Sequence, residues 1–139
     1  MLAINLKKGK ITSLEKLTLS ETGMRSQDIF EILTEGSQAA IFHYGRFYRN
    51  GEEQKELLRQ CHCELSELLE VLNKCRLLAW NGFHGAHPRN VSDGIMFSLK
   101  ALVNENRSVR AEGSENFPRH YHELKRWIAE KLSQNGEEC

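Results

Sequence analysis

The sequence predicts an α+β protein: an antiparallel sheet of about five strands, in the order β-β-β-α-β-β-α, with two helices packed on one face. Apolar and polar residues alternate over residues 95–103 and again over 109–111, the period-2 pattern of strands that each bury one face. Between them, residues 104–107 read Asn-Glu-Asn-Arg, and asparagine tolerates the positive φ of a hairpin turn. Residues 52–79 and 116–132 carry apolar residues at spacings of three and four, as amphipathic helices do. Strands that come in runs indicate an antiparallel sheet with its helices on one side.

The first fifty residues predict three short strands. Apolar positions alternate with polar ones at residues 17–20 and recur at every second position over 40–44, so both segments favour strands. The segment between them, 26–35, fits either a capped helix or a middle strand. We favour the strand, because glycine-containing turn signals on both sides leave room for an antiparallel meander.

Residues 52–79 predict one long helix with a single buried face. Asn50-Gly51 punctuates the chain before it, and Asn81-Gly82 supplies a typical C-terminal stop. The second helix is expected to begin near Asn116-Phe117-Pro118, and residues 133–139 are expected to form a frayed tail. The apolar stripe of the long helix comprises Leu57, Leu58, Cys61, Leu65, Leu68, Leu69, Leu72, Cys75 and Ala79.

Composition predicts one domain, residues 1–139, of a soluble cytoplasmic protein. A hydrophobic content of 40% and a charged content of 27% exclude disorder and fibrous repeats. The formal net charge of +0 disfavours binding to nucleic acid or to an anionic membrane. The N-terminal residues lack a signal-peptide pattern, and no stretch approaches the ~20 apolar residues of a membrane span.

The cysteines are expected to be reduced thiols. Cys61, Cys63 and Cys75 fall within the predicted long helix. There, Cys61 and Cys63 would point about 200° apart and would be unable to bridge. Thiols packed as small apolar groups fit a reducing compartment.

The loop over residues 80–93 is the first candidate site, because it gathers aromatic, basic and acidic side chains between two predicted elements. His84 and His87 are weak zinc-ligand candidates, which Asp93, His120 or His122 would complete. The sequence has no HExxH or CxxC motif, however, so we expect no metal or cofactor. Alternatively, one histidine acts as a general base beside Arg89 as an anion clamp. In the plainest interpretation the aromatics close the core and the histidines are solvated. The candidate ligand-binding residues are Trp80, Phe83, His84, His87, Arg89 and Asp93.

A second candidate is the run Arg46-Phe47-Tyr48-Arg49, whose mixture of aromatics and cations suits stacking on single-stranded nucleic acid. The balanced charge argues against it, so we expect Phe47 or Tyr48 to end a strand and pack on the core. The sequence contains no phosphate-binding loop, dinucleotide fingerprint, nucleophile elbow or EF-hand.

The leading functional hypothesis is therefore a non-catalytic binding or regulatory module. Its partner would be an unknown protein or a second copy, joined through a sheet edge or an exposed helix face. The alternatives are a metal- or anion-binding enzyme that uses the loop over 80–93, and weak binding of single-stranded nucleic acid through Arg46 to Arg49. Convergence of the loop's polar side chains on one concave pocket would favour the enzyme.

Overall fold

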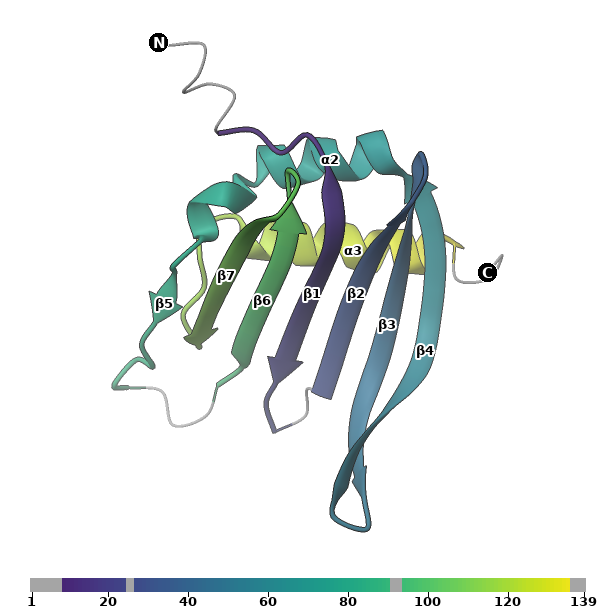
Figure 1. Cartoon of the computed structure of the whole chain (residues 1–139). Coiled ribbons are helices and arrows are strands. Elements are labelled where there is room, and N and C mark those ends of the chain that lie inside the picture. The colour runs from purple at the N-terminus through teal and green to yellow at the C-terminus, as the bar shows by residue number, and fades with distance from the viewer. Residues whose placement is uncertain (1–8, 25–26, 91–93, 136–139) are drawn as a thin grey trace.

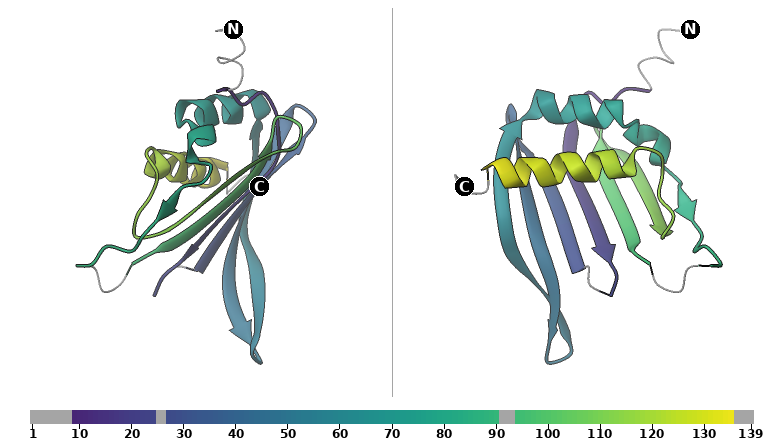
Figure 2. Two further views of the ribbon diagram at one scale, coloured as in Figure 1. Left: turned by 60° about the vertical axis from the view of Figure 1, so that its left-hand side comes forward. Right: turned by 180° about the vertical axis from the view of Figure 1, so that it is seen from behind.

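A computed structural model describes residues 9–24, 27–90 and 94–135. Seven strands form one sheet, and two α-helices lie on one of its faces (Figures 1 and 2). The predicted α+β class is confirmed, whereas the predicted number of about five strands is too low. The elements in chain order are β1 (Leu14–Thr22), β2 (Gln27–Glu35), β3 (Gln38–Arg49), β4 (Glu52–Glu64), α2 (Leu65–Lys74), the 3-10 helix η1 (Leu77–Trp80), β5 (His84–Gly85), β6 (Met96–Val103), β7 (Arg107–Ser114) and α3 (Tyr121–Asn135).

The sheet order is β4-β3-β2-β1-β6-β7-β5. All neighbours pair antiparallel except β5, which pairs parallel with β7, so the sheet is mixed and not purely antiparallel as expected. The segment predicted as strand or helix, 26–35, contributes β2. The predicted hairpin between β6 and β7 is confirmed, with positive φ at Asn104, Glu105 and Asn106.

The largest correction concerns residues 52–64, which form β4 and not the first half of a long helix. Asn50 (φ 54°) and Gly51 (φ 81°) both adopt positive φ, as a two-residue type I′ hairpin requires, and they turn β3 directly into β4. Strand geometry places Cys61 and Cys63 on the same face, opposite Ile41 and Ala39 of β3. The helix is therefore confined to α2.

The core lies between the sheet and the two helices. β1 contributes Leu17 and Leu19, α2 contributes Leu68 and Leu72, and α3 adds an apolar stripe. All of these side chains are fully buried, which is the strongest stabilising contribution that a sheet with helices on one face has. The α3 stripe comprises Tyr121, Leu124, Ile128 and Leu132.

Cys61, Cys63 and Cys75 are buried, reduced thiols. Burial raises the pKa of Cys63 to about 11 and also raises the pKa of Cys75, which keeps both in the unreactive thiol form. Cys139 lies outside the described residues.

Helix α3 runs to Asn135, so the first part of the segment expected to fray, 133–139, is helical, and residues 136–139 lie outside the described ranges. In the described part of the chain, no helix is both long and apolar enough to cross a membrane.

The two edges of the sheet differ. Residues 81–85 run along the outer side of β7, where the amide of Gly82 donates to the carbonyl of Arg110 and the amide of Glu112 donates to that of Phe83. The side-chain oxygen of Asn81 accepts the Arg110 amide as well. At the opposite edge, β4 pairs with β3 alone among the described strands.

Candidate ligand-binding site

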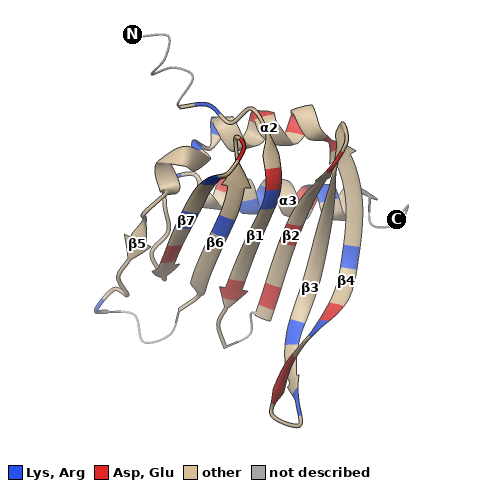
Figure 3. Ribbon diagram, in the orientation of Figure 1, with Lys and Arg blue, Asp and Glu red and all other residues tan. Residues whose placement is uncertain are grey.

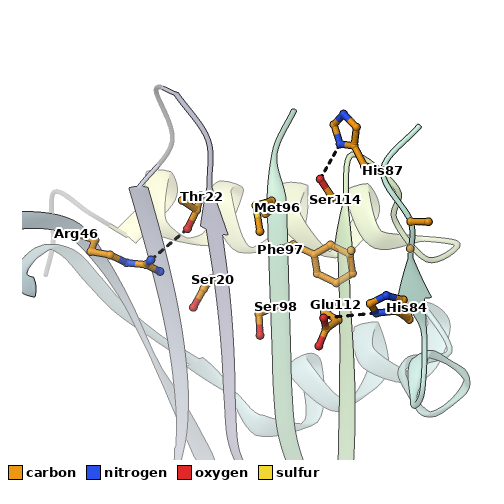
Figure 4. Close-up of a pocket in the computed structure, with 13 residues that line it drawn as sticks. Ser20, Thr22, Arg46, His84, His87, Met96, Phe97, Ser98, Glu112 and Ser114 are labelled. Carbon is orange, nitrogen blue, oxygen red and sulfur yellow. Dashed lines mark hydrogen bonds and ion pairs between the residues drawn. The ribbon is translucent and has the colours of Figure 1, made fainter. Parts of the chain in front are cut away.

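The sheet face opposite the helices is polar over β1, β6 and β7. The strand register places Ser20, Ser98 and Glu112 in one row, and β5 adds His84 beside Glu112. In this row the Ser20, Ser98 and Glu112 side chains all project from the same face, and His84 reaches Glu112 from β5 (Figure 4). No described helix covers this face, so its side chains are available to a ligand.

A pocket of about 600 Å³ opens on this polar face. Its size suits a small organic ligand, for which pockets of roughly 300–1,000 Å³ are usual. One wall comes from the segment around β5, part of the loop that the sequence singled out. The lining residues are Ser20, Thr22, Arg46, His84, Gly85, Ala86, His87, Met96, Phe97, Ser98, Glu112, Gly113 and Ser114.

Two glycines allow the chain to pass close to itself at this wall. A Cβ on Gly85 would lie 2.5 Å from the backbone oxygen of Asn116, and one on Gly113 would lie 2.2 Å from the same atom. Both contacts are shorter than any real side chain tolerates, so glycine is required at each position. The two glycines therefore let the Asn116 backbone lie against the paired residues of β5 and β7, next to His84.

The two histidines of the predicted site bind different neighbours. His84 Nδ1 lies 3.5 Å from the Glu112 carboxylate, and His87 Nδ1 lies 2.8 Å from Ser114 Oγ (Figure 4). Within the described ranges there is no group of three or more His, Cys, Asp or Glu side chains arranged to hold a metal ion. The structure brings both histidines to one pocket without directing them at a common point.

The remaining predicted residues disperse. Trp80 is buried in the core, and its indole Nε1 donates to the Arg119 carbonyl at 3.0 Å. Phe83 packs against the Phe97 ring at a centroid distance of 6.1 Å, and Arg89 is exposed outside the pocket lining. Asp93 lies outside the described residues.

Arg46 reaches the pocket from β3. Its side chain is only 15% exposed, although an arginine head carries five N–H donors. One terminal nitrogen lies 3.2 Å from the Thr22 hydroxyl, and Nε lies 3.7 Å from the Glu53 carboxylate (Figure 4 shows the first contact). Nε is buried and has no hydrogen-bond partner in the described part of the chain. The terminal N–H groups, which make one described hydrogen bond, to Thr22, are therefore the donors that face a ligand in the pocket.

The aromatic and basic run over 46–49 does not form one surface. Alternation along β3 places Arg46 and Tyr48 on one face and Phe47 and Arg49 on the other. The Arg49 guanidinium lies over the Phe47 ring, 5.5 Å from its centroid, and Tyr48 is 65% exposed. Tyr48 therefore does not pack on the core.

A second polar cluster lies on the helix-facing side. His43 Nε2 lies 2.8 Å from the Asp28 carboxylate, and the Arg59 guanidinium donates to His43 Nδ1 at 3.2 Å. Because arginine only donates, Nδ1 is the acceptor and the proton sits on Nε2. His43 also stacks on Phe30, with centroids 4.6 Å apart. These contacts satisfy both ring nitrogens of His43 within the fold, so the cluster joins β2, β3 and β4.

The chain matches no protein-family model, no curated protein and no solved structure. Its site is therefore described by its own chemistry: an arginine at one end, a histidine–glutamate pair at the other, and hydroxyl groups between them.

The sequence predicted Arg46 only as part of a candidate nucleic-acid-binding run, and it did not indicate Glu112 or the four hydroxyl residues as parts of a pocket. The period-2 pattern of β6 already placed Ser98 on the outward face. Arg46 carried no comparable signal, because it comes to the pocket only through the order of β3, β2, β1 and β6 in the sheet.

Proposed function

We propose that this protein is a non-catalytic binding module that holds a small organic anion on the open face of its sheet. The single observation that carries the proposal is the largely buried Arg46 guanidinium at the wall of the pocket, whose terminal N–H groups make one described hydrogen bond, to Thr22. A carboxylate or phosphate oxygen accepts such donors in charge-assisted hydrogen bonds, which are about twice as strong as neutral ones.

The other end of the pocket favours a donor group on the same ligand. The Glu112 carboxylate is exposed, and it faces His84 at 3.5 Å, a distance that leaves acceptor capacity for an ammonium or hydroxyl group. Neighbouring strands are about 4.8 Å apart, so β1 and β7, which flank β6, are separated by about 10 Å. A small zwitterion or a hydroxylated carboxylic acid carries an acceptor for Arg46 and a donor for Glu112.

Binding of small acids to the protein tests this function. We expect titration with glycine, diglycine, glucuronate and inorganic phosphate to shift amide NMR signals of Thr22, Ser98 and Glu112 for at least one of these probes. Arg46→Gln removes the cation and should weaken that probe's binding at least about tenfold, since hydrogen bonds to charged groups contribute about 1.5–3 kcal/mol.

Arg110→Gln is the matched control, because Arg110 is an exposed arginine on β7 outside this pocket lining. Its affinity for the same probe should equal that of the wild type. Equal affinity in Arg46→Gln and wild type, or signal shifts confined to the helix side, would refute the assignment.

One observation favours a second candidate, a hydrolase. The Ser114 hydroxyl and the His87 imidazole are 2.8 Å apart, the separation of a nucleophile and its base. It ranks second because His87 is exposed, whereas activation gains most in a site that excludes water. A fluorophosphonate probe that labels the wild type but not Ser114→Ala would establish it, and an unlabelled wild type would eliminate it.

A further inference from the structure

Strand β4 is a long edge that the described fold leaves unpaired on its outer side. It spans 13 residues, and residues 52–60 are all exposed. A free edge of this length presents a row of unpaired backbone donors and acceptors, which template the addition of another strand. Acidic and basic residues alternate along it toward the hairpin tip (Figure 3). The edge therefore favours a partner that also carries both positive and negative charges over one whose charges all have the same sign.

A bulge divides this strand into two halves. Tyr44 of β3 is opposite Leu57 and His43 is opposite Arg59, so Leu58 is the extra residue. The bulge shifts the alternation by one position, and Glu56 and Arg59 consequently face the same side, toward the helices. Glu53 and His62 both face the open side by the same count.

We propose that β4 pairs antiparallel with β4 of a second copy of this chain, about a two-fold axis between Leu57 and Leu58. In this register Glu56 lies opposite Arg59 of the partner subunit, and Glu53 lies opposite His62 of the partner subunit. The symmetry produces each contact twice. Directly opposed residues on antiparallel strands share a face and are close enough for oppositely charged side chains to stabilise the pair.

The bulge makes this register self-consistent. Without it, opposed residues whose numbers differ by an odd count would face opposite sides of the sheet. A two-residue shift in one direction places Glu53 opposite Glu64, a like-charged pair, and a shift in the other direction leaves Glu56 opposite Leu57. The central register alone matches acid with base at both positions.

The pairing also covers side chains that the monomer leaves exposed. Leu57 is 47% exposed and Leu58 is 51% exposed, and both lie at the two-fold axis. The distal part of the β3–β4 hairpin extends past both helices (Figure 2). In the paired sheet, Glu52 at that end lies opposite Cys63 of the partner subunit. Within each chain α3 packs against β4, so in the paired sheet the partner's helix layer comes beside the uncovered hairpin.

Charge reversal tests the pairing without a known ligand. We expect light scattering after size exclusion to give twice the chain mass for the wild type in the micromolar range. Glu56→Arg and Arg59→Glu should each reduce the mass to that of one chain, because each places like charges opposite one another. An equimolar mixture of the two variants should restore the double mass, since both contacts then join arginine to glutamate.

Glu105→Arg, a charge reversal in the exposed turn at 104–106, is the control and should remain dimeric. Arg59 also contacts His43, so if Arg59→Glu fails to fold, His62→Glu takes its place. It sets two carboxylates opposite one another and should reduce the mass, and mixing it with Glu53→Lys should restore the double mass. A wild type of single-chain mass throughout this range, a dimeric Glu56→Arg, or a monomeric mixture of the folded variants would overturn the proposal.

Discussion

Glu21 is a buried carboxylate that joins the centre of the sheet to α3. It is 6% exposed, and it accepts the Tyr121 hydroxyl at 2.5 Å and the Lys125 ammonium at 2.6 Å. A buried carboxylate without such partners would be strongly destabilising. Burial, together with the hydrogen bond to Glu21, raises the pKa of Tyr121 well above its usual value of 10.0.

Stability should therefore fall at alkaline pH because of Tyr121. The unfolded chain releases the phenolic proton near pH 10.0 whereas the folded chain retains it, so the free energy of unfolding is unaffected below that pH and decreases above it, by about 1.4 kcal/mol per pH unit. Urea unfolding between pH 8 and pH 11 measures the slope. Tyr121→Phe should be less stable at pH 8 by about 1–3 kcal/mol, because Glu21 loses a donor, and it should lack this alkaline component.

Tyr48→Phe is the matched control, because the Tyr48 side chain is exposed. It should retain the alkaline slope of the wild type. An unchanged slope in Tyr121→Phe would show that the loss of stability has another origin.

Residue-scale features of the site were predictable only in part. Period-2 alternation identified the outward positions of β6, and the unusual composition of residues 80–93 led to His84 and His87, which do line the pocket. The same composition also led to Trp80, whose indole is buried in the core. Nothing local distinguishes a loop aromatic that binds a ligand from one that closes a core, because the difference lies in which remote residues surround it.

At the scale of elements, two asparagines hold the segment before β1. Asn73 of α2 accepts the Ile11 amide at 2.7 Å and donates to the Ile11 carbonyl at 2.9 Å, so its amide group pairs with the backbone as a neighbouring strand would. Asn104, with φ 48°, accepts the Thr12 amide at 2.7 Å and donates to the Lys10 carbonyl. These contacts connect α2 and the β6–β7 turn to the chain entering the sheet.

Asn73→Ala should release this segment. Two hydrogen bonds to Ile11 are lost, and we expect a decrease of about 1–3 kcal/mol in the free energy of unfolding together with faster exchange of the Ile11 amide. Asn73→Asp retains an acceptor for that amide but no donor, so its loss should be smaller. Equal stability of Asn73→Ala and wild type would contradict the role assigned to the Asn73 side chain in holding the segment before β1.

The largest error of the sequence-based prediction concerns β4, which was predicted as part of a helix. The apolar residues at 57, 61, 65 and 68 fit a helical stripe, and α2 does continue that stripe from Leu65. The competing strand signal, Cys61 and Cys63 around His62, spans only three residues. What decides between them is pairing with β3 across the Asn50-Gly51 turn, a contact between segments that a window along the chain does not include.

The whole molecule is most protected at its centre. β1 lies between β2 and β6 under the helix layer, whereas the distal β3–β4 hairpin is exposed and uncovered. In hydrogen exchange, peptides from β1 and β6 should exchange more slowly than the hairpin tip by at least about a hundredfold, equivalent to about 3 kcal/mol of opening free energy. Exchange in the second half of β4 should slow further as protein concentration rises. Uniform protection across these strands would contradict the described fold.

The short strand β5 limits how far such a sheet grows. Together with residues 81–83 it occupies backbone groups of β7 that would otherwise accept a neighbour, and among the described strands β4 keeps an edge able to recruit another. A molecule with a single self-complementary edge closes into a pair about its two-fold axis, whereas one with two such edges propagates into an open-ended fibre. By covering the β7 edge, this segment of a few residues limits each chain to one partner in the proposed assembly.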